Sequence, residues 1–456
     1  MKVVNIMDYN ILRENDIRGE YGTQITAKTA KRIGQSFGSY LKLNNITEAI
    51  VGHDNRLSGE ELHAALIEGI LATGINVLDI GLATTPLFNY SAIEAKIPYG
   101  IMITASHNQA SDNGFKIFGE NYLHLEQEEL KKLYEIIKRE DFIKGQGILK
   151  KASFKNEYVN MLRSKFKFSK RLKVVFDCGH GTPSILIKDV FDNLGLDVTY
   201  LHCESDGSFP VHNPDPNDID NLGWLINEVL TKKADIGIAF DGDGDRIGIV
   251  DETGYMVYTD ILMAVFAGDI IPNVENKNVI MDVKCSKALE IELDRIGANS
   301  IMLKNGSAYI ETQMFKTPAL FGGEYSGHIF FRDDFYGFDD GIYAGLRILE
   351  LLDRKNVKCS ETHAHIEEFT NTPEIRINVP DEKKWDIVDK VKNYAMNRET
   401  DVLTIDGVRV NYADGFSLIR CSNTGPTITL RFEAKNEEVL DIRRREYLNM
   451  VNYLLK

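Results

Sequence analysis

Three carboxylates stand at alternate positions in a short stretch that reads Asp-Gly-Asp-Gly-Asp-Arg. They are Asp241, Asp243 and Asp245, and Arg246 follows them. Apolar runs on both sides, at 234–240 and 247–250, predict two buried strands. Carboxylates this close repel one another, and a divalent cation removes that cost by binding them together. The two glycines let the backbone turn tightly enough to bring three oxygens to one ion. The stretch therefore predicts a metal site at a strand-to-strand connection.

Other interpretations of this acidic stretch fit less well. An EF-hand loop needs glycine at its sixth position, where this chain has Arg246, and it needs flanking helices instead of strands. The two glycines also imitate the start of a dinucleotide fingerprint, but the aspartates between them would repel a pyrophosphate. A solvated acidic turn is improbable because both neighbouring runs are apolar.

A second reactive stretch is Thr-Ala-Ser-His-Asn at 104–108, which follows the apolar run 100–103. It therefore lies at the carboxyl end of a predicted strand, where open α/β sheets bind ligands. Lys116 supplies a cation close by in sequence, although a Ser and Asn turn with a surface lysine is the alternative. Ser106 and His107 do not form a hydrolase dyad by adjacency, because neighbouring side chains diverge and no GxSxG motif frames them.

Two more loops carry polar groups between apolar runs. The first reads Gly-Gly-Glu-Tyr-Ser-Gly-His at 322–328, and its carboxylate and hydroxyl suit the vicinal hydroxyls of a sugar. The second reads Arg-Cys-Ser-Asn-Thr-Gly-Pro at 420–426, and its guanidinium, hydroxyl and amide groups suit a phosphate. Either loop by itself is also compatible with a purely structural turn.

The elements that would position these loops repeat along the chain. A strand ending in Asp, a helix, a glycine and a second strand occur three times, which predicts three parallel βαβ units and hence three α/β domains. The units cover 49–80, 173–201 and 278–303. After residue 370 the pattern changes to strands with two helices, which predicts a smaller α+β domain. The predicted domains are 1–150, 151–254, 255–367 and 368–456.

Composition narrows the class of protein. The chain has 456 residues, of which 43% are hydrophobic and 27% charged, as in ordinary globular proteins. A net charge of −15 disfavours nucleic acid and anionic membranes as partners. The five cysteines form no CxxC pair, and we find neither a targeting signal nor an apolar run long enough for a membrane span. We therefore expect a cytoplasmic protein.

The four loops, in this order and with these gaps, resemble those of the α-D-phosphohexomutase family. The resemblance spans nearly the whole chain and is closest to the bacterial phosphomannomutase/phosphoglucomutase group. It implies three similar mixed-sheet α/β domains and a smaller α+β C-terminal domain around a central cleft. Asp16-Ile17-Arg18-Gly19 looks like the family's amino-terminal contact with the substrate phosphate.

The resemblance also implies roles for individual residues. Ser106 would carry the phosphoryl group and contact the metal, which Asp241, Asp243 and Asp245 hold. Arg18, His107, Lys116 and Arg246 would assist catalysis, and the proton acceptor would be Lys116, His107 or His328. The substrate-binding set would be Lys284, Ser307, Glu324, Ser326, His328, Arg420, Ser422, Asn423 and Thr424.

The implied activity is interconversion of hexose 1-phosphate and hexose 6-phosphate through a phosphoserine enzyme and a hexose 1,6-bisphosphate. One Mg²⁺ per chain is the implied cofactor, with the bisphosphate as activator, and small sugar phosphates are the partners of a monomer or homodimer. The Gly-Glu-Tyr-Ser-Gly-His loop favours mannose or glucose over glucosamine. The sequence departs from the usual family pattern at four positions in or beside these loops. They are Asn15, Gln109, Ser307 and Tyr325, and the last two bear on the choice of sugar. A phosphoglucosamine mutase, a non-catalytic sugar-phosphate-binding protein and a metal-dependent phosphatase are the alternatives.

Overall fold

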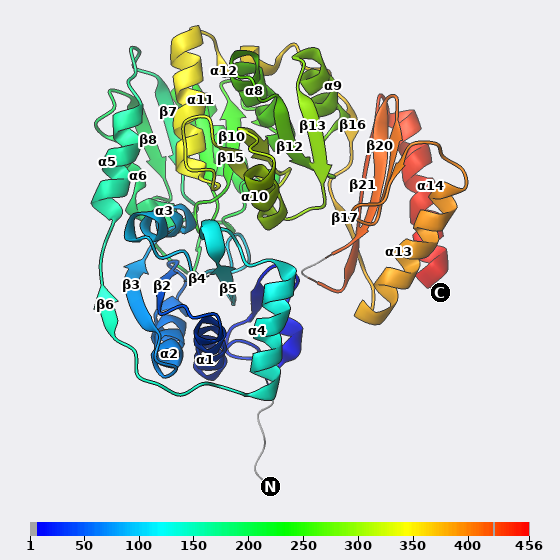
Figure 1. Ribbon diagram of the computed structural model, residues 1–456. Coiled ribbons are helices and arrows are strands. Elements are labelled where there is room, and N and C mark those ends of the chain that lie inside the picture. Colours follow the sequence, from blue (N-terminus) through cyan, green and yellow to red (C-terminus); the bar gives the residue numbers. More distant parts are fainter. Residues whose placement is uncertain (1–6, 423–424, 456) are drawn as a thin grey trace. The chain divides into compact units, whose positions relative to one another are not determined.

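The computed structural model describes residues 7–422 and 425–455 (Figure 1). The chain forms two compact units. Unit 1 comprises the chain up to residue 257 together with 338–360, and unit 2 comprises 258–337 together with 361 onward. Asn423 and Thr424 of the predicted phosphate loop lie outside the described residues. No helix within the described ranges is both long and apolar enough to cross a membrane.

Unit 1 begins with a six-stranded mixed sheet in the order β1-β5-β4-β2-β3-β6. Its strands are β1 (Ile17–Glu20), β2 (Glu48–His53), β3 (Asn76–Leu82), β4 (Gly100–Ile103), β5 (Asp112–Phe118) and β6 (Leu149–Lys151). Its helices are α1 (Ala27–Leu43), α2 (Gly59–Leu71), α3 (Thr85–Ala95) and α4 (Gln127–Arg139). The predicted βαβ unit is confirmed: β2 and β3 pair in parallel, and Gly74 has the positive φ that ends the α2 turn. Figure 1 shows α1 and α2 together on one side of this sheet and α3 on the other.

The second sheet of unit 1 has the order β11-β10-β9-β7-β8. Its strands are β7 (Lys173–Asp177), β8 (Asp197–Leu201), β9 (Ile236–Phe240), β10 (Ile247–Asp251) and β11 (Met256–Val257). Helices α5 (Lys155–Lys165), α6 (Ile187–Phe191) and α7 (Gly223–Lys232) accompany it. The helical part of the second βαβ unit is short, because a 3₁₀ turn (η3, Thr182–Ile185) precedes α6. The acidic stretch connects the antiparallel strands β9 and β10, as predicted.

Helix α11 (Gly341–Lys355) falls within the range predicted for the third domain, but it packs against β9 and β10 of unit 1. The Gly341 N–H donates to the Gly244 carbonyl at 3.0 Å. A Cβ at Gly341 would lie 2.5 Å from the Arg246 carbonyl oxygen, so glycine permits this close approach. The start of α11 therefore supports the acidic stretch directly. The four predicted domain boundaries stay predictions.

Unit 2 contains a mixed sheet and an antiparallel sheet. The mixed sheet, in the order β13-β12-β14-β15, consists of β12 (Asn278–Asp282), β13 (Asn299–Leu303), β14 (Phe321–Gly323) and β15 (Ile329–Phe331). Its helices are α8 (Thr259–Ile270), α9 (Lys287–Arg295) and α10 (Ser307–Lys316). The parallel pairing of β12 with β13 confirms the third predicted βαβ unit.

The antiparallel sheet consists of β16 (Thr370–Asn371), β17 (Ile375–Asn378), β18 (Val402–Leu403), β19 (Val408–Tyr412), β20 (Gly415–Cys421) and β21 (Thr427–Ala434). Helices α13 (Asp381–Met396) and α14 (Glu437–Leu455) pack side by side against it (Figure 1). A short helix, α12 (Cys359–His363), precedes this domain. The predicted α+β fold of the C-terminal part is thus confirmed, with an antiparallel sheet.

Candidate active site

Ser106 follows β4 in a buried turn with unusual backbone geometry. Its φ is 52°, a left-handed conformation that costs energy for a residue other than glycine. The Ser106 N–H donates to Thr104 Oγ1 at 2.8 Å, which fixes the turn from within. The side chain of Ser106 is fully buried. The surroundings therefore hold Ser106 in a strained conformation at the carboxyl end of a strand, as is typical of functional residues.

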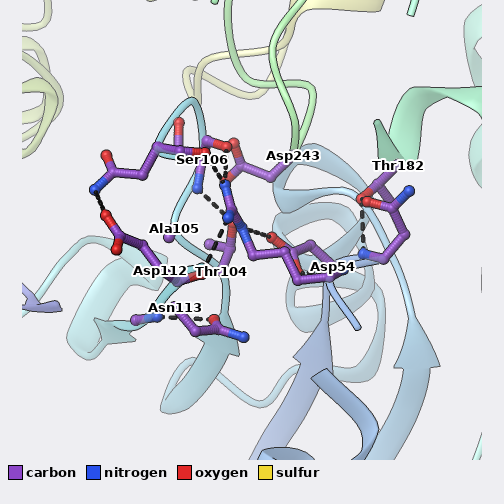
Figure 2. Close-up of polar contacts among 12 residues, drawn as sticks. Asp54, Thr104, Ala105, Ser106, Asp112, Asn113, Thr182 and Asp243 are labelled. Carbon is purple, nitrogen blue, oxygen red and sulfur yellow. Dashed lines mark hydrogen bonds and ion pairs between the residues drawn. The ribbon is translucent and has the colours of Figure 1, made fainter. Parts of the chain in front are cut away.

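Arg56 supplies most of that support from outside the turn. Its guanidinium donates to four backbone carbonyl oxygens, those of Ser106 (2.8 Å), Asn108 (2.7 Å), Gln109 (2.5 Å) and Asp112 (3.0 Å). It is buried, and its charge is balanced by Asp54, whose Oδ2 lies 3.2 Å from Nε. Figure 2 shows Asp54, Thr104, Ser106 and Asp112 gathered in this region. A planar fork that contacts four carbonyls fixes the path of the whole loop.

The serine loop and the acidic stretch meet within unit 1. Ser106 Oγ donates to Asp241 Oδ2 at 2.6 Å. The other oxygen of Asp241 accepts from the backbone N–H groups of Gly244 (3.0 Å) and Arg246 (3.1 Å). A Cβ at Gly242 would lie 2.5 Å from the Ser106 carbonyl oxygen, so glycine allows the two loops to touch. Residues more than a hundred positions apart thus form one site.

Lys116, on β5, pairs with two of the three carboxylates of the acidic stretch. Its Nζ donates to Asp243 Oδ2 at 2.7 Å and also to Asp245, and Thr85 Oγ1 donates to the same Asp243 oxygen at 2.6 Å. Burial opposes a charge here, yet the carboxylates of Asp243 and Asp245 raise the pKa of Lys116 well above its usual value. Burial likewise opposes ionisation of Asp243, but the ammonium of Lys116 holds the pKa of that carboxyl well below its usual range. Lys116 therefore acts as a fixed positive charge.

His107 turns away from Ser106 and contacts a different loop. Its Nδ1 lies 2.7 Å from Asp215 Oδ2, and Asn213 Nδ2 donates to the His107 carbonyl at 2.7 Å. Burial, followed by the nearby positive charge of Arg246, lowers the pKa of His107 to about 4. A neutral imidazole beside a carboxylate keeps its proton on Nδ1, which leaves the lone pair on Nε2. The expected divergence of Ser106 and His107 is confirmed.

Arg18 and Arg246 bring two further positive charges to this region. Arg18, on β1, donates to the Ala105 carbonyl at 3.3 Å and to Asn108 Oδ1 at 3.0 Å, and its Nε donates to Asp16 Oδ2 at 2.6 Å. Arg246 Nε lies 3.7 Å from Asp241 Oδ2. Arg18 and Arg246 thus add to the positive charge that Lys116 and Arg56 bring to the serine and the aspartates.

The donor set of the acidic stretch suits a hard divalent cation. Carboxylate oxygens of Asp241, Asp243 and Asp245 lie within 4.8 Å of one another, and all three side chains are buried. Asp243 Oδ1 is buried without a hydrogen-bond partner in the described part of the chain, and an ion would satisfy it. Oxygen-only ligands are those that Mg²⁺ prefers. The residues therefore fit a magnesium ion.

In unit 2, Glu324 organises the predicted sugar loop between β14 and β15. Its Oε1 accepts from the Gly306 N–H at 2.5 Å and from the Asn305 side chain, and Ser326 Oγ donates to its Oε2 at 2.6 Å. His328 Nε2 lies 4.0 Å from the same Oε2. Glu324 is buried in the structure. The loop is thus a set of polar groups held in fixed orientation.

Asn305 and Asp406 join the sugar loop to the phosphate loop. The Asn305 N–H donates to Asp406 Oδ2 at 3.1 Å, and Arg420 Nε donates to the same oxygen at 2.7 Å. Arg420 Nη2 is buried and has no hydrogen-bond partner within 7–422 and 425–455. A buried guanidinium nitrogen with spare donor capacity is suited to an anion. Lys384 supports the same loop by donating to the carbonyls of Ser422 (2.9 Å) and Gly425 (3.1 Å).

The two remaining predicted residues of unit 2 are Ser307 and Lys284, which lies in the turn between β12 and α9. Ser307 is the first residue of α10, preceded by Gly306 at φ 138°. Lys284 Nζ lies 3.6 Å from Glu374 Oε1 and 5.7 Å from the centre of the Tyr325 ring. The guanidinium of Arg431 stacks on that ring at 3.8 Å, so Tyr325 contacts the antiparallel sheet of the same unit. This contact gives Tyr325 a packing role.

Comparison with known families gives four successive matches that together cover most of the chain. Models of the phosphoglucomutase/phosphomannomutase alpha/beta/alpha domains I, II and III match residues 10–144, 156–254 and 258–369, and the C-terminal domain model matches 374–447. The chain belongs to this family of intramolecular phosphotransferases. Its members are α-D-phosphohexomutases, so the resemblance found in the sequence is confirmed.

Individual relatives agree with this membership. A phosphomannomutase/phosphoglucomutase of Pseudomonas putida is 40% identical over 447 residues, covering 97% of this chain and 96% of that protein. A crystal structure of a phosphoglucomutase/phosphomannomutase family protein from Burkholderia thailandensis is 34% identical, with a TM-score of 0.90 and 98% coverage of both chains. A structure of Aspergillus fumigatus N-acetylphosphoglucosamine mutase, in complex with GlcNAc-6P and magnesium, shares the fold at 15% identity. Its TM-score is 0.63, with 100% of this chain and 97% of that chain covered.

Several supporting residues of this family member were missed by sequence reasoning. They are Arg56, Thr85, Asn213, Asp215, Asn305, Lys384 and Asp406. Arg56 follows β2, at the same sheet edge as Ser106, and the carboxyl-end rule gave a usable signal for it. The others, of which Thr85 and Lys384 lie in the first turns of α3 and α13 and the rest in loops, have no local pattern that marks them as partners of distant residues.

Proposed function

We propose that this protein is a phosphohexomutase that interconverts hexose 1-phosphate and hexose 6-phosphate, with glucose, mannose or both as the sugar. The observation that carries the proposal is the 2.6 Å hydrogen bond from Ser106 Oγ to Asp241 Oδ2. It places a strained, buried serine against a group of three carboxylates, two of which, Asp243 and Asp245, pair with Lys116. A serine so placed is suited to carry a phosphoryl group in a charge-balanced setting.

In the proposed reaction, phosphorylated Ser106 gives its phosphoryl group to a free hydroxyl of the hexose monophosphate. The Oγ–P bond breaks, a bond from phosphorus to the sugar oxygen forms, and the hydroxyl proton passes to an acceptor. The bisphosphate then returns its other phosphoryl group to Ser106 Oγ after the sugar has turned over. The net result exchanges phosphate between positions 1 and 6 and leaves the enzyme phosphorylated. A hexose 1,6-bisphosphate would therefore also serve as activator by phosphorylating bare Ser106.

The residues of unit 1 are proposed to align and neutralise the phosphoryl group. Asp241, Asp243 and Asp245 would hold one Mg²⁺, which supplies positive charge to the phosphoryl oxygens. Arg18 and Arg246 add charge, and Arg56 positions the loop that carries the serine. Because Lys116 donates to two carboxylates, we assign the proton acceptor to His107 or His328 instead.

The residues of unit 2 are proposed to recognise the rest of the substrate. Glu324 and Ser326 would bind vicinal sugar hydroxyls, with His328, Lys284 and Ser307 beside them. Arg420 and Ser422, with Asn423 and Thr424, would bind the phosphate that is not being transferred. The buried Arg420 Nη2, without a partner in the described part of the chain, supports this assignment. The central cleft, the cytoplasmic location and the choice between monomer and homodimer stay predictions.

The test is conversion of glucose, mannose and glucosamine 1-phosphates in the presence of Mg²⁺ and a trace of glucose 1,6-bisphosphate. We expect glucose 6-phosphate or mannose 6-phosphate as the product. The substrate with the highest kcat/KM identifies the preferred sugar. Preferential conversion of glucosamine 1-phosphate would favour the alternative specificity. Net release of inorganic phosphate would indicate a phosphatase, and absence of any conversion would refute the proposal.

A further inference from the structure

A second cluster of ionisable side chains lies in unit 1, outside the residues described so far. Asp177 ends β7, and His202 immediately follows β8. The two strands pair in parallel, with Asp177 opposite Leu201, so their carboxyl ends meet at one edge of the sheet. His212 comes from the loop that leads from β8 towards α7. Three potential ligands therefore converge from three separate positions in the sequence.

The three side chains are close together and largely shielded from solvent. His202 Nδ1 lies 3.0 Å from Asp177 Oδ1, and His212 Nε2 lies 3.2 Å from Asp177 Oδ2. One ligand atom from each residue lies within 4.8 Å of the others. The side chains of His202 and His212 are 14% and 12% exposed, and that of Asp177 is 1% exposed. The cluster is therefore compact but reachable from solvent through its imidazoles.

The hydrogen bonding of His212 is unusual for a neutral imidazole. Its Nδ1 lies 2.9 Å from the Asn213 carbonyl oxygen, which can only accept, so Nδ1 carries the proton. Nε2 then presents a lone pair towards a carboxylate oxygen of Asp177, a repulsive arrangement. Either a second proton or a cation between the two groups relieves it. An Nδ1–H donated to a backbone carbonyl, with Nε2 facing inward, is the usual orientation of a metal-binding histidine.

A third histidine beside the cluster has the same orientation. His180 Nδ1 lies 2.9 Å from the Glu204 carbonyl oxygen, and its ring centre is 5.2 Å from that of His202. His180 Nε2 is buried with no hydrogen-bond partner among the residues that the structure describes. His180 and His202 both adopt positive φ, 58° and 47°, which is costly for residues other than glycine. Backbone strain and an unsatisfied nitrogen thus occur together around one point.

We propose that Asp177, His202 and His212 form a binding site for a zinc-class transition metal ion. Zinc lies about 2.0–2.2 Å from imidazole nitrogen and carboxylate oxygen, so tetrahedral ligands are roughly 3.3 Å apart. The observed separations of 3.0 and 3.2 Å are close to that value. Two imidazoles and one carboxylate favour Zn²⁺ over Mg²⁺, which prefers oxygen ligands. The site is chemically distinct from the all-carboxylate stretch at 241–245.

The proposed ion would have a structural consequence for the serine loop. The segment that supplies His212 continues to Asn213 and Asp215, which hold the carbonyl and the Nδ1 of His107. A metal ion bound by Asp177, His202 and His212 would fix both ends of the loop 202–212 to the end of β7, and with them the start of the segment that holds His107. His107 is the neighbour of Ser106, so the metal would act as a positioning element for the phosphoserine loop.

The first experiment measures zinc retention by the full-length protein. Chelator-treated protein is dialysed against Zn²⁺ in the presence of a millimolar excess of Mg²⁺, which occupies the aspartate site, and bound zinc is measured by mass spectrometry. We expect about one zinc ion per chain in the wild type and in His365→Gln, a half-exposed histidine used as control. His202→Gln and His212→Gln, which keep a side-chain donor for Asp177, should lose that ion. Equal zinc content in all four proteins would overturn the proposal.

A second experiment needs no substitution and so does not depend on the folding of a variant. Wild-type protein is treated with diethyl pyrocarbonate with and without Zn²⁺, again in excess Mg²⁺, and modified histidines are located by peptide mass mapping. We expect Zn²⁺ to slow modification of His202 and His212 at least tenfold while His365 reacts at the same rate. Unchanged rates at His202 and His212 would refute the site.

Discussion

The four carbonyl contacts of Arg56 lead to a specific prediction for the variant Arg56→Lys. Lysine keeps the positive charge beside Asp54 but replaces a planar fork with an ammonium that has three donors. Arg56 donates hydrogen bonds to the carbonyls of four loop residues and forms an ion pair with the Asp54 carboxylate. Lysine must therefore leave at least one of the four carbonyls without a donor in a buried environment.

The cost can be worked from this count. Leaving one buried carbonyl without its donor costs about 1–3 kcal/mol in the stability of the loop. If about 3 kcal/mol of this is lost from the aligned state of Ser106, kcat/KM falls by roughly 100-fold. The loss should appear in the transfer step, because Arg56 contacts the loop backbone and no group that we assign to sugar binding.

The assay compares kcat/KM for glucose 1-phosphate in wild type, Arg56→Lys and the matched control Arg171→Lys, an arginine whose side chain is 76% exposed. Amide hydrogen exchange of the peptide covering 104–114 is measured on the same samples. Arg56→Lys should lower kcat/KM and speed exchange in that peptide, and Arg171→Lys should do neither. Wild-type activity and exchange in Arg56→Lys would refute the role of the guanidinium fork.

Three further predictions concern other groups of unit 1. Ser106→Ala should lower kcat by orders of magnitude and abolish a species about 80 Da heavier in intact-mass spectra, and near-normal turnover would show that the nucleophile is wrong. Asp243→Asn should shift the Mg²⁺ titration of activity to higher concentration, whereas an unchanged titration would exclude that carboxylate as a ligand. Burial raises the pKa of Asp340 to about 7, so the folded protein keeps a proton that the unfolded chain has already lost between about pH 4 and 7. Above pH 7 the buried carboxylate is charged, which lowers the free energy of unfolding by up to about 4 kcal/mol. Asp340→Asn removes this charge, so it should raise the melting temperature more at pH 8 than at pH 5. An equal rise at both pH values would contradict this explanation.

The strands and the repeated βαβ units were predictable because their signals are local. Apolar runs such as 236–240 lie between acidic residues, and in each of the three units the glycine that follows the helix adopts positive φ: Gly74, Gly195 and Gly297. The acidic stretch was likewise recognisable, since its three carboxylates are close in sequence. These features depend on neighbours along the chain.

The supporting contacts were not predictable, because they join residues far apart in sequence. The position of Arg56 after a strand places it at the sheet edge where ligands bind, but nothing near it in sequence indicates that it binds carbonyls fifty or more positions away. The sheet against which α11 packs was also not predictable, because an apolar helix face can pack against any sheet. The contact with the acidic stretch depends on Gly341, which has no side chain to prevent the close approach. Tyr325 looked like a change in the sugar loop, whereas its ring packs against Arg431.

Transfer of the serine phosphoryl group is the most direct test of the proposed function. Protein labelled with ³²P at Ser106 is mixed with unlabelled glucose 1-phosphate and Mg²⁺ in a single turnover, and the products are separated. The account predicts that label appears in hexose 1,6-bisphosphate and then in hexose 6-phosphate, with Ser106→Ala carrying no label. Label that stays on the protein, or that leaves only as inorganic phosphate, would contradict it.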